Sequence, residues 1–187
     1  LPAASAAGSE RGSPFHSLRR FMKDGKGTLI FALFVACAAL FVWRTSNGLP
    51  ALVASHFGVS GMANGFMPHD FYVRFMIAFV IGLPALMVFV TGHVLGSSKV
   101  RINLPNRDYW LAPERYAETI AFLRAGLKWF GVLLVTFLCY VHWLVVVANS
   151  VQPAQLSEPR FFGGLAAFLV ALLIWLKVLL GHFRARA

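Results

Sequence analysis

The sequence is poor in charge, and above all in negative charge. Charged residues make up 13% of its 187 residues, and 7 Asp or Glu stand against 17 Lys or Arg. A soluble domain carries roughly 25% charged residues, so this composition excludes an ordinary soluble domain. No Asp or Glu falls in the middle of an apolar run. A carrier driven by protons or ions normally needs one there, which argues against that class.

Cysteine is scarce as well. The two cysteines, Cys37 and Cys139, each lie inside an apolar run. Their number and placement exclude a disulfide framework and a cysteine-based metal site. Both are expected to be small buried hydrophobic side chains.

Long apolar runs dominate what is present, and hydrophobic residues reach 58% of the chain. A helix of about 18 or more apolar residues is long enough to cross a hydrocarbon core of about 30 Å. The sequence therefore predicts an all-α, polytopic transmembrane protein with four spans, over about residues 28–45, 71–95, 125–148 and 161–180. The predicted membrane domain covers 28–187, after a tail and a basic juxtamembrane segment over 1–27.

The distribution of Lys and Arg predicts an orientation. Segment 47–70, between the first two spans, contains neither residue, whereas segment 97–124 contains five. The positive-inside rule then places 47–70 outside the cytoplasm and both termini inside. Because topology accounts for the net charge of +10, nucleic acid is not an expected partner.

A polar, proline-punctuated stretch over 103–115 separates the two pairs of spans. Pro113 suits the first position of a helix and Glu114 suits its first turn. A helix is therefore expected to begin there, run along the membrane surface and continue into the third span. Tyr109 and Trp110 are expected to anchor the stretch at the inner interface, where aromatic residues are enriched.

The charged side chains of this inner region suggest two kinds of contact. Arg101, Arg107 and Arg115 form a candidate site for a lipid head group. The carboxylates of Asp108, Glu114 and Glu118 are expected to form ion pairs with neighbouring arginines, each contributing little to stability.

Six histidines raise the question of a metal or a haem. His93 falls near the inner end of the second span, whereas His56, His69 and His142 fall on the outer side. A three-histidine outer metal site stays open as one alternative. Histidines in packing or interfacial positions are the favoured interpretation, because no helical H-x-x-x-H pair or carboxylate cluster accompanies them. Neither a metal nor a cofactor is predicted.

Two stretches resemble one bacterial family. The outer loop reads L-P-x-x-V-x-x-H-F-x-x-x-G-x-x-x-G over 49–65, and the inner stretch reads N-L-P-N-R-D-Y-W-L-A-P-E-R over 103–115. Both resemble motifs of the SdpI-like bacterial membrane proteins, which carry a domain of unknown function. The resemblance extends over about residues 28 to 147, and the inner motif is the more specific.

The resemblance implies where a ligand or partner would be sensed. The relative that gives the family its name is an immunity and signal-sensing protein against a secreted toxin. The match assigns sensing to six positions: His56, Phe57, Tyr109, Trp110, Glu114 and Arg115. Two roles for His56 stay open: reading a peptide outside the membrane, or bonding loop carbonyls to fix the loop.

The predicted function is therefore non-catalytic, with no catalytic residue. The chain is expected in the cell inner membrane, as an SdpI-like sensor or immunity protein or as an accessory subunit of a larger membrane complex. Its expected partners are the lipid bilayer and other membrane subunits or a second copy of itself. A small transporter or channel is the alternative, and a metal-binding membrane enzyme using the outer histidines is a further one.

Overall fold

The structure is a computed structural model that describes residues 25–95, 97 and 102–184. The predicted tail and most of the basic segment fall on residues 1–24, outside the described residues. So does Arg101, one of the three arginines of the predicted head-group site.

Four helical stretches are long and apolar enough to cross a membrane. The stretches are α2 (Gly25–Ser46), the consecutive α3 (His69–Ala85), η1 (Leu86–Val90) and α4 (Thr91–Leu95), then α6 (Pro113–Ala148) and α7 (Glu158–Arg184). The predicted all-α fold with four spans is thus confirmed, and the chain is a multi-pass membrane protein. The predicted spans fall within these helices, which start two to twelve residues earlier than expected.

Helix α6 is longer than a bilayer requires. Its 36 residues extend about 54 Å, against a hydrocarbon core of about 30 Å. Pro113 occupies its first turn, as predicted, and the helix runs without a break into the third span. The four-residue helix α5 (Arg107–Trp110) precedes it. The expected surface helix is therefore the protruding first part of α6.

The second span changes its helical geometry after a proline. Pro84 lies inside α3 and cannot donate a backbone hydrogen bond, and the π-helical η1 begins two residues later. The amide of Leu86 donates to the carbonyls of Gly82 and Leu83. The backbone is thus hydrogen-bonded again within two residues of the proline.

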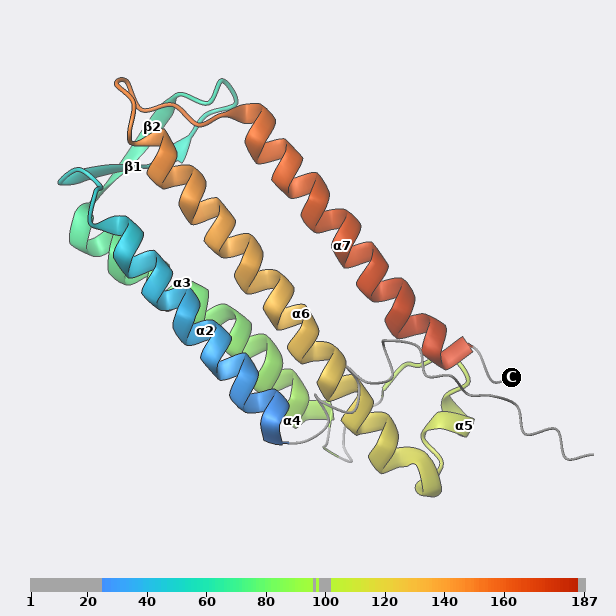
Figure 1. Cartoon of the computed structure of the whole chain (residues 1–187). Coiled ribbons are helices and arrows are strands. Elements are labelled where there is room, and N and C mark those ends of the chain that lie inside the picture. Colours follow the sequence, from blue (N-terminus) through green and yellow to red (C-terminus); the bar gives the residue numbers. More distant parts are fainter. Residues whose placement is uncertain (1–24, 96, 98–101, 185–187) are drawn as a thin grey trace, which may run out of the picture.

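Helix α6 is the centre of the bundle. Figure 1 shows α2 and α3 on one side of it and α7 on the other, and α2, α3 and α6 all contact one another. On α2 the buried side chains recur every three or four residues, which places them on one face. The core they form with α3, η1 and α6 includes Phe31, Val35, Val42, Val80, Val88 and Val135.

Helix α7 packs on α6 through small residues. The ring of Tyr140 lies directly against Gly164, where any side chain would overlap it, and its hydroxyl donates to the carbonyl of Arg160 at 2.6 Å. Farther along, Trp175 Nε1 donates to the carbonyl of Gly126 at 3.1 Å. Much of the remaining surface of α7 is exposed apolar side chain.

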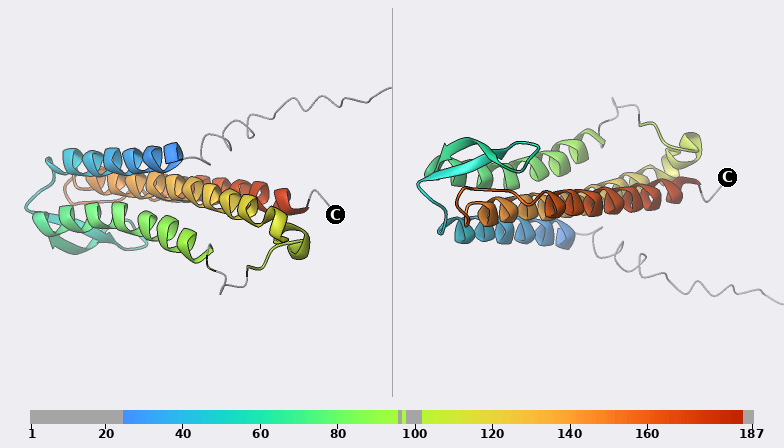
Figure 2. Two further views of the ribbon diagram at one scale, coloured as in Figure 1. Left: turned by 90° about the horizontal axis from the view of Figure 1, so that it is seen from below. Right: turned by 90° about the horizontal axis from the view of Figure 1, so that it is seen from above.

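The segment between the first two spans is a β-hairpin, which the sequence analysis did not predict. Strands β1 (Leu52–Phe57) and β2 (Ala63–Pro68) pair antiparallel, with an irregularity in the register around His56. Figure 2 shows the hairpin at one end of the bundle and α5 at the other. These are called the hairpin end and the α5 end below.

The prediction that both cysteines are buried is wrong for Cys37. This side chain is exposed on α2, whereas Cys139 on α6 is half-buried and packs against the core. Cys37 comes two residues after Val35 and one before Ala38, so it lies outside the face that carries the buried positions of α2. An apolar run alone does not separate a face that packs on protein from one that packs on lipid.

Candidate functional site

One edge of the hairpin is held by a side chain at the end of α6. Asn149 follows the last residue of this helix, and its Oδ1 accepts the backbone N–H of Ala54 at 2.9 Å. Its Nδ2 donates to the carbonyl of Ala54 and to that of Val145, each at 2.9 Å. The amide of Asn149 thus pairs with β1 as a neighbouring strand would, and Ala54 is fully buried.

The turn of the hairpin is held by the α6–α7 loop. The amide of Leu156 donates to the carbonyl of Gly61 at 2.8 Å, and the amide of Ala63 donates to Ala154 at 3.3 Å. Met62 and Gln155 form a further antiparallel bridge. Gly61 has a φ of +71°, and a side chain there would meet the Leu156 carbonyl. The hairpin is therefore fastened on two sides to segments that leave α6.

The hairpin turns an apolar face away from the bundle. Val53 is fully buried beneath it, whereas Leu52 is 57% exposed, Phe66 is 54% exposed and Val59 at the turn is 98% exposed. An edge strand with such a face is ordinarily a site of further association. Here Ala54 on β1 and Ala63 at the start of β2 are already bonded to Asn149 and Ala154, so we expect recognition to use mainly the exposed side chains.

The two hairpin residues that the resemblance singled out have different surroundings. His56 is exposed, and its Nδ1 lies 3.1 Å from the hydroxyl of Ser55. Its register partner is Gly65, whose missing side chain leaves room for the His56 ring. Phe57 is half-buried and packs against the core. Phe57 is therefore a packing residue, and the sensing role expected for it stays a prediction.

Beneath the hairpin, a buried histidine joins three helices. His142 on α6 is fully buried; its Nε2 lies 2.8 Å from Thr45 Oγ1 on α2, and its Nδ1 lies 2.9 Å from the Tyr72 hydroxyl on α3. The Thr45 hydroxyl donates to the carbonyl of Phe41 at 2.7 Å, so it accepts from Nε2–H, and Tyr72 donates to Nδ1. Each polar atom of this network has a partner.

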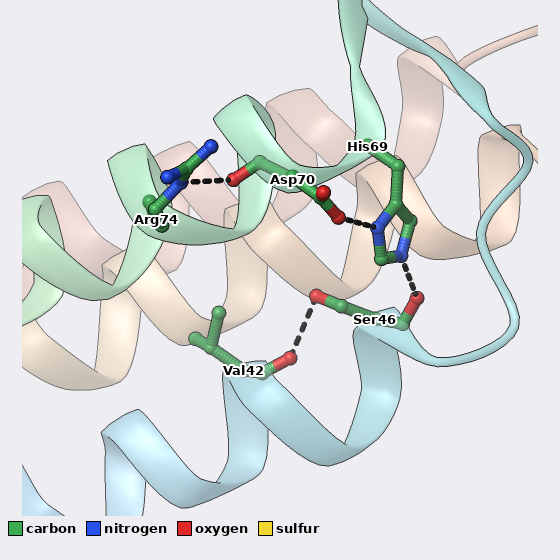
Figure 3. Close-up of polar contacts among 5 residues, drawn as sticks. All are labelled: Val42, Ser46, His69, Asp70 and Arg74. Carbon is green, nitrogen blue, oxygen red and sulfur yellow. Dashed lines mark hydrogen bonds and ion pairs between the residues drawn. The ribbon is translucent and has the colours of Figure 1, made fainter.

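A second histidine at the hairpin end holds α2 and α3 together (Figure 3). His69 Nε2 lies 3.1 Å from the carbonyl of Ser46, and its Nδ1 lies 3.1 Å from a carboxylate oxygen of Asp70. Both neighbours are acceptors, so only a ring that carries a proton on each nitrogen donates both bonds. The geometry therefore fits the protonated, cationic form of His69 beside the Asp70 carboxylate.

The structure does not bring the three outer histidines together. His142 is enclosed by Thr45 and Tyr72, His69 by Ser46 and Asp70, and His56 lies exposed on the hairpin. No group of three His, Cys, Asp or Glu side chains within metal-binding reach occurs in residues 25–95, 97 and 102–184. A three-histidine metal site is therefore not formed there.

At the α5 end, Trp110 packs inside the protein, and its predicted place at the membrane interface is wrong. Its side chain is 8% exposed, and Nε1 donates to the carbonyl of Phe183 near the end of α7 at 3.1 Å. Asn106 Nδ2 donates to the same carbonyl at 3.3 Å, and Thr119 Oγ1 donates to the carbonyl of Trp110 at 2.7 Å. Trp110 therefore ties α5 to the end of α7.

The other residues of the inner motif remain on the surface. Tyr109 is exposed, with the guanidinium of Arg115 over its ring at 4.0 Å from the centroid. Glu114 and Arg107 are exposed. The predicted ion pairs of Asp108, Glu114 and Glu118 with arginines do not form among the described residues, where the ion pair is His69 with Asp70. The ring of Tyr109 also meets that of Trp110 edge to face, with the centroids 5.2 Å apart, so Tyr109 contacts two other predicted sensing residues.

Three important polar residues were missed: Thr45, Tyr72 and Asn149. Each lies within a turn of a span end, where polar side chains commonly mark the boundary of the apolar run. Thr45, Tyr72 and His142 all fall at the hairpin end of their helices, and this shared depth was the available signal. Their pairing depends on which faces of α2, α3 and α6 meet, which one sequence does not disclose.

No family model matches the chain, and no curated protein or solved structure matches it either.

Proposed function

We propose that this chain is a non-catalytic membrane protein, a sensor or immunity protein of the SdpI-like kind, and that it recognises a partner with its β1–β2 hairpin. On this proposal the hairpin lies on the non-cytoplasmic side of a bacterial inner membrane, as the absence of Lys and Arg from 47–70 predicts. The observation that carries the proposal is the hairpin itself, which is fastened on two sides and presents an apolar face.

A fixed hairpin is well suited to recognition. Association requires exposed groups to be ordered, and a surface that is already ordered loses less free energy on binding. The bonds from Asn149 and Leu156 order the backbone before any partner arrives. Leu52, Val59 and Phe66 then supply apolar area on an element that lies beyond the ends of the spanning helices.

The residues of the outer motif support this assignment. Gly61 is needed for the turn and Gly65 for the space beside His56. Two of the motif glycines therefore build the hairpin, and His56 is the motif residue whose ring remains exposed on it. The His56 ring is exposed, and among the described residues it bonds to Ser55 and to no loop carbonyl. Of the two roles considered for His56, this arrangement fits contact with a partner.

An accessory subunit of a larger membrane complex is the second candidate. It is favoured by α7, which packs on α6 alone among the long helices. Large apolar side chains such as Leu169, Leu173 and Ile174 are 47–64% exposed on it. Lipid or a neighbouring transmembrane helix would cover such a face equally well.

Photo-crosslinking in native membranes tests the proposal. A photo-crosslinking amino acid replaces Val59 in one variant and Phe66 in another. We expect a covalent adduct of one defined mass from both hairpin positions. The yield of this adduct is expected to fall when His56→Ala is introduced, because the exposed imidazole would contact the same partner. Detection is by mass spectrometry of the purified adduct.

Leu173 on α7 is the matched position, since it is similarly exposed but lies on a membrane-spanning helix away from the hairpin. A crosslinker there is expected to give no protein adduct. An adduct from Leu173 alone would contradict hairpin recognition and favour the accessory subunit.

A further inference from the structure

A pocket of about 450 Å³ opens between α2 and α3 at the hairpin end. One wall is apolar and consists of Trp43, Val73 and Ile77. Ile77 lies about 10 Å deeper along α3 than Asp70, at about 1.5 Å per residue. The pocket therefore runs from the end of the bundle into the membrane-embedded part of the two helices.

The mouth of this pocket holds one negative and two positive groups (Figure 3). Asp70 uses one carboxylate oxygen for His69, and its side chain is 84% exposed. Arg74 donates from Nε to the carbonyl of Asp70 at 3.0 Å, which turns its guanidinium away from the Asp70 carboxylate. Asp70 and Arg74 stand one helical turn apart and form no ion pair with each other.

These charges leave specific bonding positions unused. Within the described part of the chain, the two terminal nitrogens of Arg74 have no hydrogen-bond partner, and neither does the second carboxylate oxygen of Asp70. A guanidinium binds a phosphate through paired N–H groups, and a carboxylate accepts hydrogen bonds from an ammonium group. The mouth is thus complementary to a ligand that carries both a phosphate and a primary ammonium.

We propose that this pocket binds a phospholipid with a primary ammonium head group, of the phosphatidylethanolamine class. Its phosphate lies on Arg74, its ammonium on Asp70, and one acyl chain follows Trp43, Val73 and Ile77 into the membrane. The inference rests on the membrane location of the chain and does not depend on the proposed function of the hairpin.

The same geometry discriminates against other common head groups. Phosphatidylglycerol has no ammonium group, so it can offer the free carboxylate oxygen of Asp70 only neutral hydroxyl donors, and their hydrogen bonds are weaker than a charge-assisted one. Phosphatidylcholine has no N–H to donate. It would need an open aromatic face instead, and the ring of Trp43 already has the Arg44 guanidinium over it at 5.4 Å.

Native mass spectrometry of the delipidated full chain, titrated with the three lipids carrying identical acyl chains, tests this proposal. We expect phosphatidylethanolamine to bind roughly tenfold more tightly than the other two, the value of one charge-assisted hydrogen bond. Asp70→Asn should lower the affinity of the chain for phosphatidylethanolamine to its affinity for phosphatidylcholine. Arg74→Gln should weaken the binding of all three lipids by a similar factor, because each carries a phosphate.

Glu158→Gln and Arg160→Gln are the controls, because they remove one negative and one positive charge at the hairpin end of α7, away from the pocket. They should leave the affinity for all three lipids unchanged. Glycerophosphoethanolamine, which has the head group without acyl chains, should not compete at the concentrations used. Equal binding of the three lipids, or unchanged binding to the Asp70→Asn and Arg74→Gln variants, would overturn the proposal. Full competition by glycerophosphoethanolamine would also overturn it, because the site would then take soluble phosphate esters.

Discussion

Replacing Asn149 with leucine is expected to release the β1–β2 hairpin from α6 and to lower the free energy of unfolding by about 3 kcal/mol. The amide of Asn149 bonds both the N–H and the carbonyl of Ala54. Ala54 is fully buried, so water does not reach either group when the amide is removed. An unsatisfied buried polar group costs about 1–3 kcal/mol, and this substitution leaves two.

Hydrogen exchange of the Ala54 amide measures this effect directly. In Asn149→Leu the exchange is expected to accelerate by up to roughly a hundredfold, the equilibrium equivalent of about 3 kcal/mol. Asn64→Leu is the control, because Asn64 is exposed on β2 and makes no hydrogen bond through its side chain in the described structure. Equal exchange in the two variants would show that the bonds from Asn149 do not hold the hairpin.

The second large effect is expected from His142→Leu, which should lower the free energy of unfolding by about 2 kcal/mol. Thr45 keeps its bond to the carbonyl of Phe41, whereas the Tyr72 hydroxyl loses its acceptor inside the protein. Interhelical hydrogen bonds in membrane proteins contribute only about 0.6 kcal/mol on average, so most of the loss comes from the hydroxyl left without a partner.

A double-mutant cycle separates these contributions. Adding Tyr72→Phe to His142→Leu removes the unsatisfied hydroxyl and should recover about 1 kcal/mol, since replacing both partners by apolar groups is often nearly neutral. The measurement is reversible unfolding in mixed micelles. Strictly additive losses would mean that Tyr72 and His142 are not coupled, and the network would then not join α2, α3 and α6.

The spans were predictable because length and apolarity decide whether a helix crosses a membrane. Lateral packing was not predictable. Cys37 and Cys139 occupy equivalent apolar runs, yet one is exposed and the other packs on the core. Which face of α2 meets α6 depends on complementary shapes on both helices, such as Gly131 receiving Phe31.

The hairpin was not predicted because the glycines and prolines of 47–70 argue against a continuous helix but do not by themselves indicate strands. The same residues build the turn, since Gly61 has a positive φ and Gly65 leaves room for His56. Trp110 was misplaced for a different reason. Aromatic residues at a predicted interface usually face the lipid head groups, but here the carbonyl of Phe183 offers a partner inside the protein.

The depth argument for the histidines was partly successful. It placed His142 at the same end as His69 and His56, and the structure agrees. Depth alone did not disclose that each ring has different neighbours. The candidate site therefore emerged from polar partners on other helices, which one sequence without relatives does not reveal.

Thiol labelling at two positions tests the central claim, that the hairpin faces away from the cytoplasm. In a Cys37→Ala, Cys139→Ala background, Asn64→Cys marks the hairpin and Asp108→Cys marks α5, and both positions are exposed. A membrane-impermeant maleimide added to intact bacterial cells, with periplasmic access, is expected to label Asn64→Cys at once and Asp108→Cys only after the inner membrane is permeabilised. Labelling in the reverse order would place the hairpin in the cytoplasm and contradict its role as an outward-facing recognition element.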